Sequence, residues 1–373
     1  MTQRMLAQGN VAIGWGAVAA GCRHFFGYPI TPQNEVTEWF AKELPQREGI
    51  FLQGQCETGS INMVMGAAAA GVRVMTSTSS PGWALMQETI SHMVNAELPC
   101  VIALVQRGGP GQGTTQHAQM DYLSATRGGG NGGYKNIVLA PASVQENHDF
   151  IQLAFHLADK YRNPVVMLSD GLLGQLMEPL ELRTLDLDPL PPKDWAVIGM
   201  GAHGESRRRA VACNTGLIFV ERHASYLDFI EALDKKFKEM ETEVRYESYR
   251  TEDARLVLVA YGYCARVSQE AVDWARDEGL AVGLLRPMTV WPFPYQAVAA
   301  AADRGAAFLV VEDSLGQMVD DVRLGAAGKT PVHLLNMLSR HMKSASGMIL
   351  PDTVFQRIKD TIDQEEKSGT AVG

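Results

Sequence analysis

The chain has 373 residues and a formal net charge of −9, with 46% hydrophobic and 20% charged residues. A chain of this length buries a large core and is expected to form two or three domains. The acidic balance and the lack of a concentrated basic patch argue against a nucleic-acid or membrane-surface partner, and no apolar run approaches the roughly 18 residues that a transmembrane helix needs.

The N-terminus and the cysteines both indicate a protein of a reducing compartment. Gly9, Asn10 and Gly14 interrupt the apolar stretch that a secretory signal needs, so we expect a cytoplasmic location. The cysteines stand far apart, without a Cys-x-x-Cys pair to hold an iron–sulfur cluster or zinc, and we expect no metal site. They are Cys22, Cys56, Cys100, Cys213 and Cys264. We expect buried, reduced thiols.

Residues 9–170 alternate helical periodicity with short apolar runs that end in Gly, Pro, Ser or Thr. This alternation predicts a doubly wound parallel α/β domain. The expected strands are 25–28, 72–76, 100–106, 136–140 and 165–169, and the expected helices are 11–21, 58–71, 84–96 and 144–160. Ligands bind outside the carboxyl ends of such strands, where the polar loops 28–32, 76–82 and 107–111 follow, so we expect these loops to converge.

The sequence pattern changes twice in the rest of the chain. A proline-rich stretch and a highly charged helix at 227–246 predict a linker, and a second alternation then predicts a smaller α/β domain. Its expected elements are 256–261, 265–278, 281–285, 308–311 and 332–335. We divide the chain into an α/β domain at 1–180, a linker with the charged helix at 181–253, the smaller domain at 254–345 and a C-terminal helical tail at 346–373.

Two single residues are each open to two interpretations. Thr31, in a turn held by two prolines, is either a helix N-cap or a hydroxyl presented to a ligand. Glu57 stands at the start of an Ala- and Gly-rich helix, where a carboxylate either complements the positive helix end or, if desolvated, shares its proton with a ligand nitrogen.

Several short sequence motifs, in the same order along the chain, resemble those of the alpha-type subunit of 2-oxoacid:ferredoxin oxidoreductases. They are 28–32 (Tyr-Pro-Ile-Thr-Pro), Glu57, 61–63, 66–71, 75–82, 97–99, 105–111, 119–122, 128–130, 139–146 and 159–164, with 260–262, 285–294 and 311–313 in the second domain. The runs in the first domain are most similar to the branched-chain, 2-oxoisovalerate members, and the similarity is weak between 189 and 252. The resemblance implies a thiamine-diphosphate pyrimidine-type domain followed by a transketolase C-terminal-like domain.

The resemblance implies that thiamine diphosphate is bound between this chain and a partner. Glu57 matches the glutamate that contacts the aminopyrimidine N1′, Thr31 a threonine near the reacting carbonyl, and Arg107 an arginine that approaches the substrate carboxylate. These three are the candidate catalytic residues, although Arg107 has the alternative of a structural ion pair. The candidate cofactor-binding residues are Tyr28, Pro29, Ile30, Glu57, Ser79 and Pro81.

The family pattern also implies partners. The Gly-Asp-Gly start that thiamine enzymes use for Mg²⁺ and diphosphate has its nearest match in Ser169-Asp-Gly171, which lacks the following Asn. We therefore expect Mg²⁺ and diphosphate on a beta-type subunit and the 4Fe-4S clusters on a partner, with a ferredoxin-like or other Cys-rich electron-transfer subunit. The implied reaction is the oxidative decarboxylation of a 2-oxoacid with coenzyme A to acyl-CoA and CO₂, or its reverse.

Two alternatives to this reading stay open. The run 199–204 fits Gly-x-Gly-x-x-Gly from Gly199 to Gly204, with Glu221 beyond it, and would suit an NAD(P)-binding dehydrogenase. A scaffold subunit that has kept the fold without the chemistry is the other. The substrate is also open, because branched-chain members often carry His-Gly-Asp where this chain has Asn131-Gly-Gly133.

Overall fold

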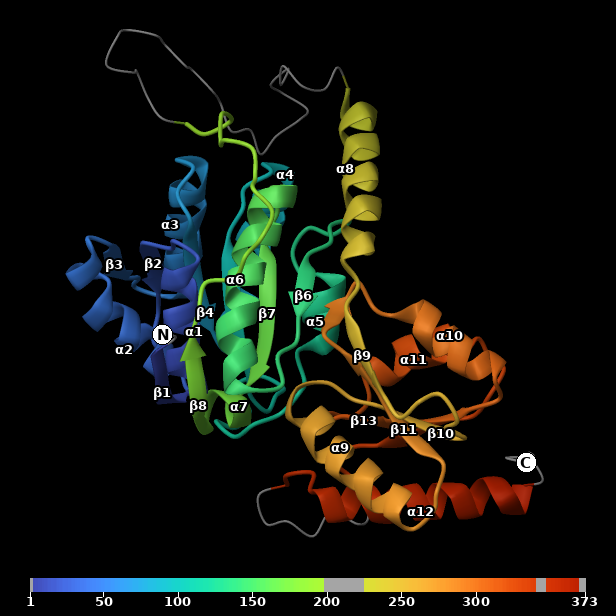
Figure 1. The fold of residues 1–373 in the computed structure, drawn as a ribbon. Coiled ribbons are helices and arrows are strands. Elements are labelled where there is room, and N and C mark those ends of the chain that lie inside the picture. The colour runs from blue at the N-terminus through green and yellow to red at the C-terminus, as the bar shows by residue number, and fades with distance from the viewer. Residues whose placement is uncertain (1–2, 198–224, 340–346, 369–373) are drawn as a thin grey trace, which may run out of the picture.

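The computed structural model describes residues 3–197, 225–339 and 347–368, and its larger sheet has seven strands (Figure 1). The strand order is β12 (Thr289–Trp291), β6 (Ile137–Leu139), β7 (Val165–Asp170), β5 (Val101–Gln106), β4 (Val74–Thr78), β2 (His24–Gly27) and β3 (Ile50–Gln53). All neighbours pair in parallel except β12, which runs antiparallel to β6. Because β4, β5 and β7 are buried along their whole length, they are mostly apolar or β-branched without alternation, and their polar residues lie toward the carboxyl ends.

Helices cover both faces of this sheet. α1 (Gly9–Ala19), α2 (Asn34–Glu43) and α6 (Val144–Tyr161) pack together, whereas α3 (Glu57–Ala69) packs against α4 (Ser80–Asn95). The shorter helices are α5 (Tyr122–Arg127) and α7 (Gly171–Gln175), and η1 (Pro45–Arg47) follows α2. α1 and α6 approach closely because Gly16 has no side chain: a Cβ there would lie 2.2 Å from the carbonyl oxygen of His148.

The second sheet has five strands in the order β14 (Val332–Leu335), β13 (Ala307–Val311), β10 (Leu256–Val259), β11 (Val282–Pro287) and β9 (Tyr246–Tyr249). Only β9 is antiparallel to its neighbour. α9 (Gly262–Asp277) packs against α12 (Pro351–Ser368), and α10 (Tyr295–Asp303) packs against α11 (Met318–Ala326). α8 (Tyr226–Met240) and η2 (Glu241–Glu243) precede β9 (Figure 1). None of the helices among the described residues is long and apolar enough to cross a membrane.

The expected doubly wound fold with a smaller second α/β unit is confirmed, and the expected strands appear with ends shifted by a few residues. Several features differ from the expectation. The strands β1 (Gln3–Gln8), β3, β8 (Met177–Leu182), β9 and β12 were not expected, and β12 comes from the chain segment of the second unit yet extends the first sheet. The charged helix ends at Met240 instead of 246, because residues 246–249 pair with β11. The division into four parts at 180, 253 and 345 stays a prediction.

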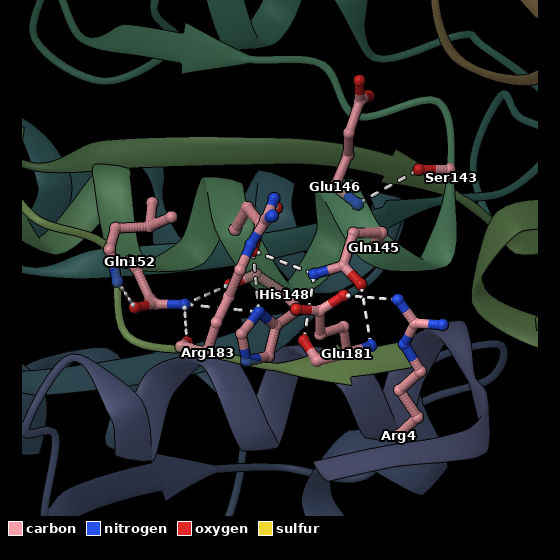
Figure 2. A network of polar contacts seen from close by, with 10 residues as sticks. Arg4, Ser143, Gln145, Glu146, His148, Gln152, Glu181 and Arg183 are labelled. Atoms are coloured by element: carbon pink, nitrogen blue, oxygen red, sulfur yellow. Dashed lines mark hydrogen bonds and ion pairs between the residues drawn. The ribbon is translucent and has the colours of Figure 1, made fainter. Parts of the chain in front are cut away.

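Strand β8 (Met177–Leu182) lies outside both large sheets and pairs only with β1 (Gln3–Gln8). Figure 2 shows how side chains of α6 hold its other edge. The Gln145 amide donates to the carbonyl of Glu181 at 3.2 Å and accepts from its backbone N–H at 2.9 Å, as a neighbouring strand would. Gln152 likewise donates to the carbonyl of Arg183 at 3.1 Å. The amides of α6 thus satisfy an otherwise unpaired strand edge.

The segment between the two units is fixed by an ion-pair cluster at Glu243. Its carboxylate accepts hydrogen bonds from Lys160 at 2.6 Å, Tyr161 at 2.8 Å and Arg245 at 2.9 Å. Burial raises the pKa of Glu243, but these bonds outweigh it and lower the pKa to about 2.

We expect Glu243→Gln to lower the free energy of unfolding by about 1–3 kcal/mol at pH 7, because Lys160 and Arg245 lose the balancing negative charge and one of the two accepting oxygens becomes an NH₂ donor. The folded pKa of about 2 lies below the ordinary value of 4.5, so this stabilisation exists above pH 4.5 and is lost as the pH falls toward 2. Urea denaturation of both proteins between pH 7 and pH 3 measures the difference. Glu241→Gln, at an exposed neighbour, is the control. A gap between Glu243→Gln and the parent that does not narrow with falling pH would contradict the assignment.

Candidate active site

Adjacent parallel strands bring the expected site loops to one edge of the large sheet. β2, β4 and β5 are neighbours, and the loops that leave their carboxyl ends carry Thr31, Ser79 and Arg107 in turn. Glu57 begins α3, which follows the edge strand β3. The three expected loops therefore converge, as strand order in a doubly wound sheet requires.

Glu57 is a buried carboxylate without a partner. It is 7% exposed, and no other described residue forms a hydrogen bond or ion pair with its side chain. It lies against the first turn of α4, because a Cβ on Gly82 would be 2.6 Å from its Cγ and 2.8 Å from its Oε1. The position at the first turn of α3 suits the favourable helix-end interaction. A buried carboxyl group that leaves its hydrogen-bonding capacity unused also suits a ligand nitrogen with which it can share a proton.

The start of α4 presents a second unused polar group. Ser79 is the N-cap residue of α4, yet its hydroxyl makes no capping bond, is fully buried, and has no hydrogen-bond partner among the described residues. Pro81 stands in the first turn of the helix and is half-buried. The Ser79 hydroxyl therefore keeps its hydrogen-bonding capacity for a ligand at this helix start.

Arg107 lies between two loops of the site. Its guanidinium donates to the carbonyl of Thr31 at 2.9 Å and to the carbonyl and side-chain oxygens of Gln112 at 3.0 and 3.1 Å. The side chain is 5% exposed, and its buried Nε has no partner among the described residues. Since no salt bridge to Arg107 occurs in the described part of the chain, the alternative of a structural ion pair is not supported.

Hydrogen bonds from two side chains fix the turn at 28–32, which carries Tyr28, Pro29, Ile30 and Thr31. Buried Gln33 donates to the carbonyl of Tyr28 at 3.1 Å. The carbonyl of Pro32 accepts from Asn10 at 2.8 Å. Thr31 itself is exposed, and its hydroxyl accepts only a long 3.4 Å bond from Asn34.

The N-cap of α2 is Gln33, so the interpretation of Thr31 as an N-cap is wrong. Its hydroxyl is presented at the surface of a rigid turn, while Pro29 is exposed and Tyr28 and Ile30 are half-buried.

Ser80 and Asp121 belong to the site but were not singled out in the sequence. The Ser80 hydroxyl accepts from the backbone N–H of Arg107 at 3.0 Å and also hydrogen-bonds the Asp121 carboxylate. Burial raises the pKa of Asp121 to about 6, although Ser80 and the charge of Arg107 lower it. Nothing in a local pattern signals this contact, because it joins the ends of β4 and β5 through tertiary packing.

We expect Gly82→Ala to displace the Glu57 carboxylate and to destabilise the chain by about 1–3 kcal/mol, since the added methyl would also lie 2.2 Å from Thr78 Oγ1. Gly66→Ala on α3 is the matched control, because a Cβ there meets nothing within 4 Å. It is expected to leave stability unchanged or to raise it by up to about 1 kcal/mol. Thermal denaturation of the two variants tests this, and equal transition temperatures would contradict the close packing of Gly82.

Comparison with known proteins identifies the family. Residues 15–243 match the family described as "Pyruvate flavodoxin/ferredoxin oxidoreductase, thiamine diP-bdg", and residues 254–344 match "Pyruvate:ferredoxin oxidoreductase core domain II". A ketoisovalerate oxidoreductase subunit VorB from Methanothermobacter marburgensis is 45% identical, over 90% of this chain and 94% of that protein. A 2-oxoglutarate synthase subunit KorA from Methanothermobacter thermautotrophicus is 38% identical, with the same shares covered.

Solved structures agree with these matches. The 2-oxoglutarate:ferredoxin oxidoreductase from Magnetococcus marinus, a structure with 2-oxoglutarate, coenzyme A and succinyl-CoA bound, superposes with a TM-score of 0.81 at 27% identity. The match covers 96% of this chain and 65% of that one. A split-gene transketolase shares the fold with a TM-score of 0.59 at 14% identity, and covers 95% of this chain. The resemblance seen in the motifs is thus confirmed: the chain belongs to the 2-oxoacid:ferredoxin oxidoreductase family and is one subunit of such an enzyme.

Proposed function

We propose that this chain completes a thiamine-diphosphate site at an interface with a beta-type subunit, and that Glu57, Thr31 and Arg107 act there in the CoA-dependent oxidative decarboxylation of a 2-oxoacid or its reverse. The observation that carries the proposal is the buried Glu57 carboxylate, which has no partner among the described residues and lies at the same sheet edge as Arg107. When bound, thiamine diphosphate supplies a nucleophilic carbon and accepts the electron pair left by the departing CO₂.

Glu57 is proposed to hold a proton at its carboxyl group, facing the aminopyrimidine ring. A carboxyl group with little water around it hydrogen-bonds a ring nitrogen more strongly than an exposed one. The packing of Gly82 against Glu57 Cγ and Oε1 supports this role, because it fixes the carboxyl group in one position. Tyr28, Pro29, Ile30, Ser79 and Pro81 are proposed to line the same cofactor site, and the unpaired Ser79 hydroxyl supports this assignment.

Arg107 is proposed to bind the carboxylate of the 2-oxoacid. A guanidinium has five N–H donors, and its buried Nε is free among the described residues, so donor capacity remains for an anion. The bond from Arg107 to the carbonyl of Thr31 supports a position of the Thr31 turn beside that proposed carboxylate. The exposed Thr31 hydroxyl is proposed to donate to the reacting carbonyl group.

The remaining chemistry is proposed to lie on partner chains: Mg²⁺ and the diphosphate on the beta-type subunit, and 4Fe-4S clusters with a ferredoxin-like or other Cys-rich subunit. The Asp170 carboxylate, the nearest match to a diphosphate motif, accepts from the backbone N–H groups of Leu172 and Leu173 at 3.0 and 2.9 Å and so caps α7. Exposed Leu52 on β3, which precedes α3 in the chain, and exposed Leu85 on α4, which packs against α3, offer apolar surface for a partner. A cytoplasmic location fits this chemistry.

For the substrate, we propose a branched-chain 2-oxoacid such as 2-oxoisovalerate, because the VorB relative is more similar than the KorA relative. Turnover of a panel of 2-oxoacids by the assembled complex decides this, and a preference for 2-oxoglutarate would contradict it. The NAD(P)-binding alternative rests on Gly199, Gly204 and Glu221, which lie outside the described residues. Saturable binding of NADH to the purified chain alone would favour that alternative.

We expect Glu57→Gln in the assembled complex to lower kcat by roughly 10²-fold or more, since loss of proton transfer typically costs about 10²–10⁴. The rate of acyl-CoA formation measures this. Glu38→Gln, at an exposed position on α2, should keep the parent rate. Unchanged turnover in Glu57→Gln would remove the carboxylate from the mechanism and would favour a scaffold role for this chain.

Arg107→Lys should lower kcat/KM for the 2-oxoacid by roughly 10- to 100-fold, because lysine keeps the charge but loses the planar fork. We expect most of the loss in KM for the 2-oxoacid and none in KM for coenzyme A. Steady-state kinetics with each substrate varied separates the two constants. An equal rise in both KM values would mean that the substitution disturbs the whole site rather than the binding of one carboxylate.

A further inference from the structure

The long loop between β5 and α5, residues 107–121, is anchored on the second sheet. The backbone N–H of Gln119 donates to the carbonyl of Asp313 at 2.7 Å, and the backbone N–H of Asp313 donates to the Gln119 side chain at 3.1 Å. The same side chain donates to the carbonyl of Tyr261 at 2.9 Å. Because Asp313 follows β13 and Tyr261 follows β10, the ends of two strands of the second sheet hold this loop of the first.

A hydrogen bond between His117 and the Asp313 carboxylate reinforces this anchor. His117 Nδ1 lies 2.8 Å from Asp313 Oδ2, and the two side chains are 11% and 1% exposed. The imidazole also packs edge-on against Tyr263, with ring centroids 5.4 Å apart. The hydrogen bond to Asp313 raises the pKa of His117 although burial opposes it, and the nearby Asp170 carboxylate raises it further. The short contact between Nδ1 and Oδ2 thus holds the imidazole and the Asp313 carboxylate in one relative position.

The anchor reaches Arg107 through few contacts. The residue before His117 is Gln116, whose carbonyl accepts from the backbone N–H of Gly108 at 3.1 Å. Gly108 follows Arg107, and the loop folds back so that Gln112 accepts two bonds from the Arg107 guanidinium. The position of the guanidinium thus depends on a loop whose far half is fixed by Asp313.

Stability alone does not require this pair. The two units are already joined at Asp321 of α11, which accepts from Tyr122 at 2.7 Å and from Arg127 at 2.6 Å and also bonds Tyr295. A buried ion pair contributes little net stability, because desolvation offsets most of its attraction. Its value here lies in geometry, since a hydrogen-bonded pair fixes where a loop stands.

We propose that Asp313 and His117 are positioning residues. Asp313, in the second unit, holds His117 and thereby fixes the loop that carries Arg107 in the position that binds the carboxylate of the substrate. This inference rests on the proposed role of Arg107 and adds a determinant more than 200 residues away in sequence. According to this proposal, a residue at the end of a strand of the second sheet influences substrate binding without contacting the substrate.

The test compares Asp313→Ala with Asp313→Asn in the assembled complex. Asp313→Ala removes the acceptor and should raise KM for the 2-oxoacid by roughly tenfold or more, since a displacement of about 1 Å can cost up to about 100-fold in rate. KM for coenzyme A should stay as in the parent. Asp313→Asn keeps a side-chain oxygen that accepts a hydrogen bond from a neutral His117. Its KM for the 2-oxoacid should therefore be close to that of the parent. Equal KM values for the 2-oxoacid in Asp313→Ala and the parent overturn the inference.

Two controls separate this result from general damage and from failure of the proposed function. Glu243→Gln removes another partly buried ion pair, away from the loop, and should lower thermal stability without changing KM. Hydrogen exchange of the isolated chain should show faster exchange in residues 108–119 of Asp313→Ala, whether or not the complex is active. Unchanged exchange there overturns the inference by itself. If the parent complex has no 2-oxoacid oxidoreductase activity, the proposed function is wrong. The hydrogen-exchange rates of residues 108–119 still test whether Asp313 anchors the loop.

Discussion

Parallel pairing of β2, β4 and β5 is the constraint on which the site depends. Strands that run in one direction leave their carboxyl ends at one edge, so the turn after β2, the start of α4 and the loop after β5 meet there. Each loop would otherwise be an isolated surface feature. Side chains behind the loops fix their positions. Gln33 donates a hydrogen bond to the carbonyl of Tyr28, and the Ser80 hydroxyl accepts one from the backbone N–H of Arg107.

The polar groups at this edge are only partly satisfied by the described residues. Glu57, the Ser79 hydroxyl and the Arg107 Nε are buried and lack partners there, whereas buried polar groups elsewhere are mostly paired. Leaving such groups unpaired costs free energy, about 1–3 kcal/mol each. Unpaired polar atoms also occur elsewhere in the described residues, but at this edge three such groups lie on loops and helix starts that converge, as expected of a half-site that a cofactor, a substrate and a partner subunit complete.

The second unit is more than an appended domain. Its segment supplies β12 to the first sheet, its Asp321 bonds α5, and its Asp313 holds the loop that carries Arg107. Figure 1 shows α5 and β6 on the side of the first sheet that faces the second unit. The arrangement means that the geometry of the first unit's loops is set in part by residues that follow it by more than a hundred positions.

The sequence by itself determined the fold class, the positions of the buried strands along the chain, the place of Glu57 at a helix start and the places of Thr31 and Arg107 in loops after strands. Long apolar runs and Gly- or Pro-rich loops are local signals, and the motif resemblance identified the family. Only the tertiary structure decided the strand β12, the missing capping role of Thr31, and the contacts of Ser80 and Asp121. These depend on residues that are distant in sequence, and the three-residue β12 carries no period long enough to be recognised. The contact between His117 and Asp313 has the same origin, because packing of two separate sheets creates it and neither residue stands out in its own segment.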